Sequence, residues 1–373
     1  MLIRPVAPKD LDALYRIADE SGPGFTSLMP DRDALLRKIE HSVESFAREV
    51  ETPSDEHYLF VLEDPATGSI MGTTGIEACA GQTRPLYHFH HNTVVHHSRE
   101  LGLRKQVDTL TRCNHYTGCT EICSLYLRPD FRRANAGKLL SRVRFLFMAQ
   151  HPDRFSSTVI AEMRGVSDAA GQSPFWSWLR EHFVDMEFAS ATSLVGAGYT
   201  DFIDELMPGA PLYTHLMSRE ARAVIGQVHP QTQPALRMLE NEGFRPRGFV
   251  DLFDAGPTVE AELRRIRSIR QSRRASVILD ANASDAPDEL MSPMIVANGR
   301  LSDFRATITE HDNMLATGES VRIGPRLAEN LGLQADGVAW SLPLQPNSAS
   351  RPHEQPDASA MNAHRFGERH HAH

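Results

Sequence analysis

The sequence has little cysteine and no long hydrophobic run. Its 373 residues include four cysteines, too few for a disulfide framework in a chain of this length, so we expect free thiols in a reducing compartment. The apolar runs are far shorter than the roughly 18 residues that a membrane-spanning helix needs. The first residues lack a cationic segment followed by an apolar stretch, so no secretory signal peptide is expected. These absences predict a cytoplasmic protein with no membrane partner.

Positive charge is scarce as well. There are 39 Lys and Arg residues against 48 Asp and Glu residues, and the formal net charge is -9. The densest basic segment, at residues 264–274, is too sparse to follow a phosphate backbone, so we expect no nucleic-acid partner. The content of 41% apolar and 23% charged residues is typical of a globular protein. The length corresponds to two or three domains at about 150 residues each.

Apolar periodicity predicts a mixed architecture. Helices are expected at residues 9–20, 31–50, 135–150, 173–188 and 234–241, and strands at 2–3, 58–62, 69–75, 87–95, 120–127, 158–163 and 244–253. The strands at 58–62 and 69–75 are expected to form a hairpin. The order strand, helix, strand over residues 120–163 predicts a β-α-β crossover. The short apolar segment 224–228, with the helix and strand after it, predicts a second such unit. We therefore predict an α/β (α+β) fold with a mixed central sheet flanked by helices.

The periodic signal becomes weaker beyond about residue 275. Residues 1–275 are expected to form the main domain with insertions. After a polar loop at 280–288, only residues 293–308 and 320–323 resemble strands, so 276–344 are expected to form a small β-rich segment. Residues 345–373 contain few apolar side chains to offset the entropy of ordering the chain. We expect a disordered tail there.

The strongest local signal for chemistry is at residues 125–140, Leu-Tyr-Leu-Arg-Pro-Asp-Phe-Arg-Arg-Ala-Asn-Ala-Gly-Lys-Leu-Leu. A strand ends at a proline, two arginines follow, and small residues lead into a helix. The unpaired backbone N–H groups and the positive end of that helix then point at one place, an arrangement that binds phosphate. A plain strand-to-helix connection has the same pattern. The segment alone leaves both interpretations open.

Together with residues 234–244, Pro-Ala-Leu-Arg-Met-Leu-Glu-Asn-Glu-Gly-Phe, this segment resembles the two halves of the acyl-CoA-binding core of GNAT-type N-acyltransferases. Within that superfamily the chain is similar to the arginine N-succinyltransferase family, through blocks dispersed over residues 1 to about 270. These include Ile3-Arg-Pro, Glu20-Ser-Gly-Pro-Gly-Phe-Thr-Ser-Leu, His97-Ser-Arg-Glu-Leu, Ile160-Ala-Glu-Met-Arg-Gly, Val228-His-Pro-Gln-Thr-Gln-Pro-Ala and Phe253-Asp-Ala-Gly-Pro-Thr. The resemblance implies a GNAT-like acyltransferase fold. It also implies succinyl transfer from succinyl-CoA to the α-amino group of L-arginine, the first step of the arginine succinyltransferase catabolic pathway.

The resemblance implies which residues bind the coenzyme. The backbone at Leu125 and Leu127 is expected beside the pantetheine, and the pyrophosphate is expected on four residues of the loop and helix start: Arg132, Arg133, Asn135 and Gly137. Asn135 stands where most GNAT proteins have a glycine, and asparagine is among the non-glycine residues that best tolerate left-handed backbone. Succinyl-CoA enters as a co-substrate, and no permanently bound cofactor is implied.

The resemblance places His229 in the role of proton donor to the departing thiolate. The wider superfamily often has a tyrosine for this purpose where the present chain has Leu239. A histidine that titrates near pH 6.5 can also take up the proton of the attacking amine. The alternative is a surface-turn histidine before Pro230 with no catalytic role.

Other functions and partners stay open. Because the family includes paired, related subunits, the chain can be a non-catalytic acyl-CoA-binding subunit, or a related enzyme that acts on ornithine or another amine. We expect a homo-oligomer or a pairing with a related subunit. Among the carboxylates that can clamp the guanidinium of arginine, Glu77, Glu162 and Asp201 are candidates.

A metal site is the least favoured of the candidate sites. Cys113, His115, Cys119 and Cys123 offer zinc ligands, but zinc sites favour two closely spaced ligand pairs, and this spacing does not match them. The sequence therefore predicts no bound metal.

Overall fold

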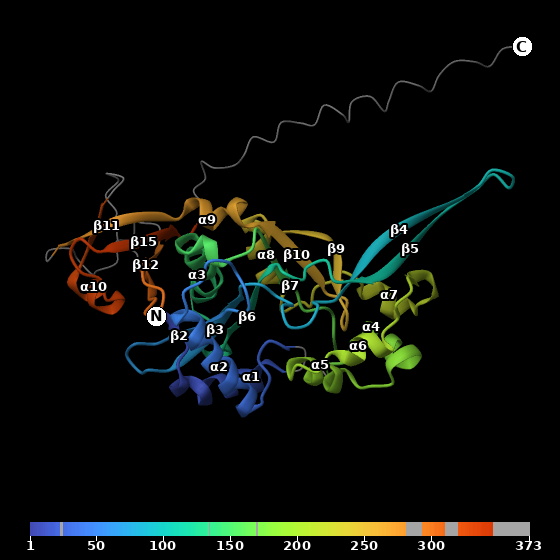
Figure 1. The fold of residues 1–373 in the computed structure, drawn as a ribbon, viewed down its shortest axis with the longest axis horizontal. Helices are drawn as coiled ribbons and strands as arrows, with labels where there is room; N and C mark the ends of the chain where they lie inside the picture. The colour runs from blue at the N-terminus through green and yellow to red at the C-terminus, as the bar shows by residue number, and fades with distance from the viewer. Residues whose placement is uncertain (23–24, 134, 169–170, 281–292, 310–319, 346–373) are drawn as a thin grey trace, which may run out of the picture.

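The computed structural model describes residues 1–22, 25–133, 135–168, 171–280, 293–309 and 320–345. In this part of the chain, fifteen strands form one sheet in the order β14-β11-β15-β12-β13-β1-β2-β3-β6-β7-β10-β9-β4-β5-β8. Helices lie on both faces of its central part (Figure 1). The predicted mixed sheet flanked by helices is confirmed. No helix among the described residues is long and apolar enough to cross a membrane.

The central part follows the predicted order of elements closely. Its strands are β1 Leu2–Pro5, β2 His57–Glu63, β3 Ile70–Glu77, β6 Thr120–Leu127, β7 Thr158–Glu162, β9 Arg245–Asp251 and β10 Pro257–Glu262. Its helices are α1 Leu11–Ser21, α2 Arg32–Ala47, α3 Ala136–Gln150, α8 Gln233–Glu242 and α9 Arg267–Gln271. The hairpin of β2 and β3 is antiparallel, and β6 and β7 are parallel on either side of α3 in the sequence. Both the predicted hairpin and the predicted crossover are confirmed.

The two faces of the central sheet are covered by different helices. Phe60 and Leu62 of β2 belong to the same buried cluster as Phe147 of α3. The alternate residues Leu59 and Val61 belong to the cluster formed with α1 and α2. This division follows from the period of two in a strand, which sends successive side chains to opposite faces. We refer to these as the α3 face and the α1–α2 face.

The two parallel strands β6 and β7 diverge soon after they begin. Their register pairs Thr120 with Val159 and Glu121 with Ile160, and no further pair follows. On its other side β6 remains paired with β3 as far as Leu127. A register shift next to Ser124, whose φ is 52°, marks a bulge that bends β6. We call the resulting opening, between residues 123–127 of β6 and the end of β7, the splay.

An insertion separates β7 from α8. It contains α4 Pro174–Leu179, α5 Phe188–Gly196, α6 Asp201–Leu206, β8 Leu212–Tyr213 and α7 Arg219–Val224. The predicted helix at 173–188 is wrong in its second half. Helix α4 passes into a π-helical turn at Arg180–Val184, which ends at Asp185 with a φ of 43° and leaves Phe183 39% exposed.

The insertion ends next to the residues where it began. Val228 forms an isolated antiparallel bridge with Gly165, and the His229 N–H donates to the Arg164 carbonyl at 2.9 Å. The predicted strand-like segment 224–228 is therefore wrong, because α7 ends at Val224 and Val228 alone makes a bridge. Since 228–229 lie against 164–165, the chain enters α8 close to the end of β7.

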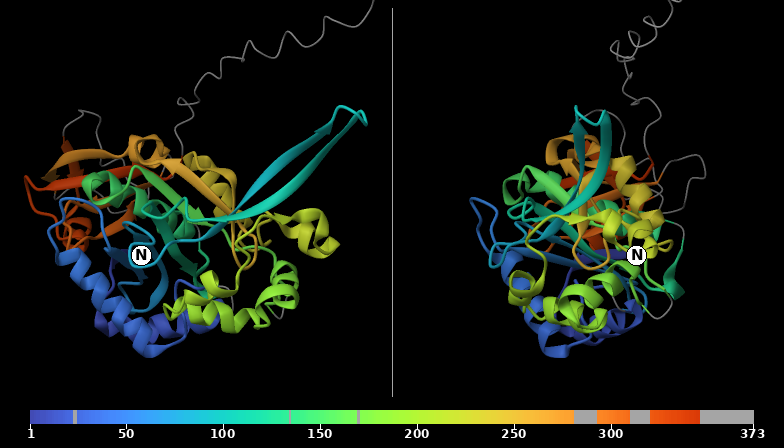
Figure 2. Two further views of the ribbon diagram at one scale, coloured as in Figure 1. Left: turned by 45° about the vertical axis from the view of Figure 1, so that its right-hand side comes forward. Right: turned by 90° about the vertical axis from the view of Figure 1, so that its right-hand side faces the viewer.

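Strands β4 His88–Ser98 and β5 Leu103–Cys113 form a long hairpin that projects from the body of the molecule (Figures 1 and 2). The base of β4 pairs with β9, and two residues of β5 pair with β8. Toward the tip the described strands pair with each other. The sequence predicted the first of these strands and not the second.

The C-terminal strands continue the sheet beyond β1. They are β11 Arg273–Leu279, β12 Met294–Asn298, β13 Ala306–Thr309, β14 Ser320–Ile323 and β15 Val338–Pro343, accompanied by α10 Pro325–Leu331. The single strand predicted at 293–308 is in fact two antiparallel strands, β12 and β13. β13 pairs with β1, Ile3 opposite Ala306. The predicted loop at 280–288 and the predicted tail at 345–373 lie outside the described residues except for Asp280 and Gln345.

Candidate active site

The segment between β6 and α3 has the geometry of an anion-binding loop. Asn135 has a φ of 70°, so the left-handed conformation expected there is confirmed. The Leu139 N–H donates to the Asn135 carbonyl at 2.9 Å. The preceding amides of Gly137 and Lys138 have no acceptor within the helix, because the first turn of any α-helix lacks one. These amides and the helix dipole create a site for a negative group.

Three arginines surround this helix start. Arg128 makes a two-pronged hydrogen bond to Glu20 of α1, at 2.9 Å from Nε and 2.7 Å from Nη2, which ties the loop to α1. Arg133 lies 3.3 Å from Asp64, and its side chain is 51% exposed. Arg132 is exposed. Both side chains of the Arg pair are therefore exposed at the loop that precedes the helix.

The splay lies next to this loop. Leu125 and Leu127 are partly buried and pack against the main core, and their strand has no ladder partner on the β7 side beyond Glu121. A Cβ added to Gly137 would stand 4.0 Å from Leu127, so the start of α3 lies close to the end of β6. The structure thus brings the predicted backbone positions and the predicted pyrophosphate residues together. Their role in binding stays a prediction.

His229 lies on the β7 side of the splay. The Met163 N–H bonds the Pro257 carbonyl of the β10 side. By the alternation of an extended chain, the Arg164 carbonyl then points to the opposite edge, toward β6. That carbonyl accepts the His229 N–H. His229 therefore stands at the edge of β7 that faces the splay, and its side chain is partly exposed.

The hydrogen bonding of the His229 imidazole fixes its tautomer. The Gln231 N–H donates to Nδ1 at 3.2 Å, so the proton of the neutral ring lies on Nε2. Burial, and after it the charge of Arg164, lower the pKa of His229. The ring is therefore neutral in most molecules at pH 7, with its Nε2–H free to donate.

A group of carboxylates lies at the beginning of the splay. Glu77 of β3 is directly opposite Glu121 of β6, so both side chains project to the α1–α2 face. Glu162 of β7 lies two residues beyond Ile160, the parallel neighbour of Glu121, and shares that face. We call Glu77, Glu121 and Glu162 the carboxylate cluster.

The environment of Glu121 and Glu162 disfavours their ionisation. Burial, with the nearby charges of Asp251 and Glu77, raises the pKa of Glu162 to about 8. Burial, with the charges of Glu162 and Glu77, raises the pKa of Glu121 well above its ordinary value. His88 of β4 contacts Glu162 at 2.7 Å, and burial lowers the pKa of its imidazole to about 4. Perturbed groups of this kind are common where a protein binds or transforms a ligand.

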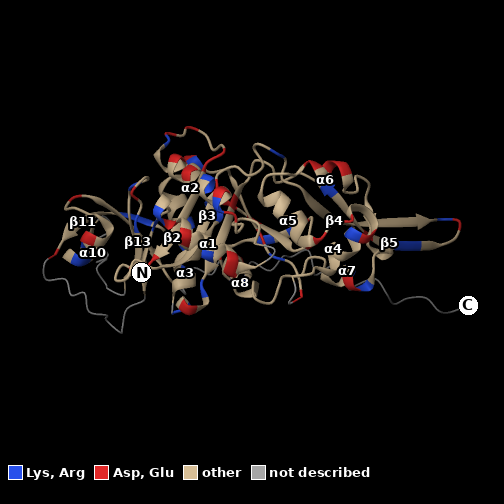
Figure 3. Cartoon of the chain, turned by 90° about the horizontal axis from the view of Figure 1, so that it is seen from below, with Lys and Arg blue, Asp and Glu red and all other residues tan. Residues whose placement is uncertain are grey.

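The sequence foresaw part of this cluster. Glu77 and Glu162 were candidates for the guanidinium clamp and lie together. The third candidate, Asp201, starts α6 with 83% of its side chain exposed, 3.6 Å from Arg84, and belongs to a row of acidic residues on that helix (Figure 3). Glu121 was missed. The sequence did contain a signal for it, because Glu121 is the charged residue in a predicted strand, 120–127, whose other residues are uncharged.

The candidate zinc ligands are not assembled. Within the described residues, the group whose ligand atoms lie within 4.8 Å of one another is His57, Glu77 and Cys123, and it contains only one of the four candidates. Burial lowers the pKa of His57 and raises that of the Cys123 thiol to about 12, which disfavours the thiolate that zinc needs. The absence of a bound metal stays a prediction.

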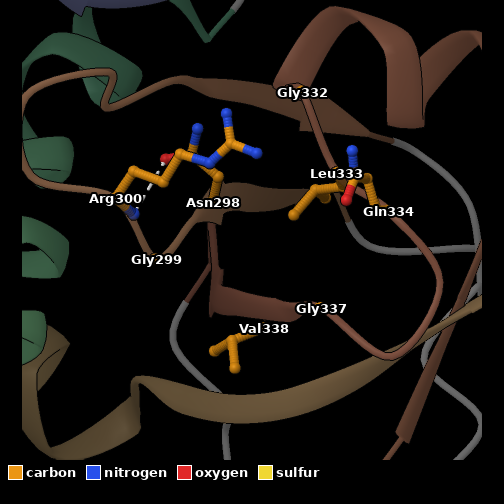
Figure 4. Close-up of a pocket in the computed structure, with 8 residues that line it drawn as sticks. All are labelled: Asn298, Gly299, Arg300, Gly332, Leu333, Gln334, Gly337 and Val338. Atoms are coloured by element: carbon orange, nitrogen blue, oxygen red, sulfur yellow. Dashed lines mark hydrogen bonds between the residues drawn. The ribbon is translucent and has the colours of Figure 1, made fainter.

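A separate pocket of about 190 Å³ lies in the C-terminal strands. It is bounded by the end of β12, the end of α10 and the start of β15 (Figure 4), with Asn298, Arg300 and Gln334 among its lining residues. Asn298 donates to the Asp303 and Leu331 carbonyls at 2.8 and 2.9 Å. These bonds connect the end of β12 to the loop before β13 and to the end of α10.

Comparison with known proteins decides the family. The model of the arginine N-succinyltransferase beta subunit matches residues 1–268, and that of its C-terminal domain matches residues 273–343. The chain belongs to the arginine N-succinyltransferase family. An arginine N-succinyltransferase of Citrobacter koseri is 46% identical over 312 residues, which cover 84% of this chain and 89% of that protein. One from Escherichia fergusonii is 44% identical with the same coverage.

A solved structure of this family has the same fold. The arginine/ornithine succinyltransferase subunit AI from Pseudomonas aeruginosa aligns with a TM-score of 0.82 at 36% identity, over 92% of this chain and 99% of that chain. The resemblance to the arginine N-succinyltransferase family is thereby confirmed, and an acyl-CoA co-substrate is consistent with it. The division into domains at residue 275 stays a prediction.

Proposed function

We propose that this chain transfers the succinyl group of succinyl-CoA to the α-amino group of L-arginine, giving N2-succinyl-L-arginine and coenzyme A. The main support for this activity is the splay of β6 and β7 next to the start of α3, in a chain that belongs to the arginine N-succinyltransferase family. An extended thioester fits along the unpaired edge of β6 while its phosphates reach the loop. Succinyl-CoA is then a co-substrate, and no permanently bound cofactor is needed.

The chemistry requires few protein groups. A neutral amine attacks the thioester carbonyl, and backbone N–H groups at residues 123–127 can stabilise the oxygen that becomes negative. The tetrahedral intermediate collapses with loss of the coenzyme A thiolate. In our proposal the His229 Nε2–H donates a hydrogen bond to that sulfur. Because the pKa of His229 is lowered, the neutral ring predominates, and full transfer of the Nε2 proton to the sulfur requires a second proton on Nδ1. The attacking amine releases that proton, and its binding displaces the Gln231 N–H from Nδ1.

A second acceptor is ornithine. The Pseudomonas neighbour is named as an arginine/ornithine succinyltransferase, and both amino acids carry a cationic side chain. The same neighbour is named as a subunit. We therefore propose that the present chain assembles with copies of itself or with a related subunit.

The test is thiol release from succinyl-CoA in a panel of amino acids, with the products identified by mass spectrometry. We expect release with L-arginine and succinylation at its α-nitrogen. Release with ornithine at a higher kcat/KM would favour the second acceptor. Binding of succinyl-CoA without release for any amino acid would instead identify a non-catalytic acyl-CoA-binding subunit.

A further inference from the structure

The partly buried carboxylate cluster lacks the basic partners that the buried Glu242 has. Glu242, 1% exposed, is paired with Arg142 at 3.2 Å and Arg267 at 2.9 Å. Among the described residues, the ion pair that reaches the cluster is the contact of His88 with Glu162. The three glutamates are partly buried, with 28% of the Glu162 side chain exposed. Partial burial of carboxylates without a cation is costly, so the cluster is an incomplete arrangement.

The nearest lysine does not fill this role. Lys38 of α2 lowers the pKa of Glu121 by its charge, but its ammonium group donates to the Ser27 carbonyl at 2.8 Å. Asp251 adds a fourth negative group from β9, opposite His88 in the register, and it raises the pKa of Glu162. The carboxyl groups of the cluster and of Asp251 thus gather at the beginning of the splay, and the lysine whose charge reaches Glu121 is hydrogen-bonded elsewhere.

A fully buried polar side chain at the cluster also lacks a partner. Thr258 of β10 has no exposed surface, and its Oγ1 makes no hydrogen bond. It lies directly opposite Glu162 in the antiparallel register, so its side chain projects to the same face. His88, which also has no exposed surface, contacts Glu162, with 2.7 Å between its Nε2 and a carboxylate oxygen. Buried polar groups without partners are uncommon and point to a missing ligand.

We propose that the carboxylate cluster is the subsite for the guanidinium group of the acceptor arginine. This inference rests on the proposed function and names the residues that select its substrate. Guanidinium is a planar cation with five N–H donors. Glu77, Glu121 and Glu162 present acceptors from three adjacent strands, and adjacent strands are about 4.8 Å apart. The Thr258 hydroxyl adds an acceptor beside Glu162.

The position of the cluster agrees with this role. Glu121 is the last residue of β6 that pairs with β7, and the free edge of β6 begins directly after it. An amino acid held by its side chain at the cluster can therefore present its α-amino group toward a thioester in the splay. A bound cation would also favour ionisation of Glu121 and Glu162, which burial and mutual repulsion oppose in the free protein.

The test compares arginine with citrulline, whose ureido group has nearly the same shape and no charge. We measure kcat and KM for both acceptors in the wild-type protein and in Glu121→Gln and Glu162→Gln. Asp201→Asn is the matched control, because it removes an exposed carboxylate outside the cluster. Calorimetric binding of succinyl-CoA reports on folding of each variant.

The proposal predicts that the wild-type protein prefers arginine strongly. Each cluster variant should raise the KM for arginine at least tenfold and lower the preference for arginine over citrulline at least tenfold, with succinyl-CoA binding retained. Asp201→Asn should keep the wild-type preference. Thr258→Val, which keeps the shape of the side chain, should change the preference in the same direction as the cluster variants and by less.

Three results would overturn the subsite. A wild-type protein that uses citrulline as well as arginine has no cation subsite, although the proposed function would survive. Cluster variants that lose kcat equally for both acceptors would place the carboxylates in the chemical step or in the fold. Loss of arginine transfer with EDTA and recovery with Zn²⁺ would indicate a metal at His57, Glu77 and Cys123. If the wild-type protein transfers nothing to arginine, the proposed function fails first.

Discussion

At the scale of single residues, the chemistry depends on environments that composition does not reveal. His229 was identified through a family resemblance, but its tautomer is set by the backbone of Gln231, and its pKa is lowered by burial and Arg164. Glu121 illustrates the opposite case. Its charge is visible in the sequence, whereas its pairing with Glu77, 44 residues earlier, becomes visible only in the strand register.

His229→Gln should lower kcat by about 10² to 10⁴, the usual contribution of a group that donates to the leaving atom, with succinyl-CoA affinity within a few-fold of wild type. Steady-state kinetics and calorimetry measure the two quantities. His215→Gln, an exposed histidine outside the site, is the control and should retain activity. Near wild-type turnover by His229→Gln, with the same pH profile, would show that this histidine is structural.

The raised pKa of Glu162 also predicts a pH dependence of stability. An unfolded glutamate ionises near pH 4.5, whereas burial holds the pKa of Glu162 at about 8 in the folded protein. Its contribution to stability is therefore fully present below pH 4.5 and is lost as the pH rises toward 8. We therefore compare the melting temperatures of Glu162→Gln and the wild-type protein at pH 5 and at pH 8.5, without substrates. The difference, variant minus wild type, should be more positive at pH 8.5 than at pH 5. The same difference in melting temperature at both pH values would contradict a raised pKa of Glu162 in the folded protein.

At the scale of elements, the sequence predicted correctly those helices and strands whose bounds are set by local residue patterns. Strand β6 was predicted with correct bounds, because an extended run of residues ends at a proline. Strand β5 was missed, since its outer half is exposed on both faces and shows no alternation. The end of α4 was missed because the π-helical turn and the left-handed Asp185 are set by packing in the insertion. The left-handed backbone conformation of Asn135 was predicted correctly, because it depends on the residue itself and its neighbours in the loop.

The anion-binding loop gives a direct test at this scale. Asn135 adopts a φ of 70°, which costs a branched residue more than asparagine and costs glycine little. Asn135→Val should therefore weaken succinyl-CoA binding about tenfold or more, while Asn135→Gly should bind within a few-fold of wild type. Calorimetric titration measures both. Equal affinities of the two variants would show that the loop conformation does not matter for the coenzyme.

At the scale of the whole molecule, distant segments of the chain build one structure around the splay. The C-terminal strands extend the sheet through the pairing of β13 with β1, and Phe304 and Leu342 belong to the same core as Phe60 and Phe147. The sequence predicted a small β-rich segment there and did not predict its pairing with β1, because a pairing such as Ile3 with Ala306 leaves no local signal. The insertion between β7 and α8 likewise returns His229 to the end of β7.

The central claim is that transfer takes place in the splay, with the coenzyme along β6 and on the start of α3. Amide hydrogen exchange with and without succinyl-CoA tests it across the whole chain. The account predicts slower exchange at residues 123–127 and 135–138, and little change at the tip of the β4–β5 hairpin or near Asn298. Protection confined to the C-terminal strands, with residues 123–138 unchanged under saturating succinyl-CoA, would contradict it.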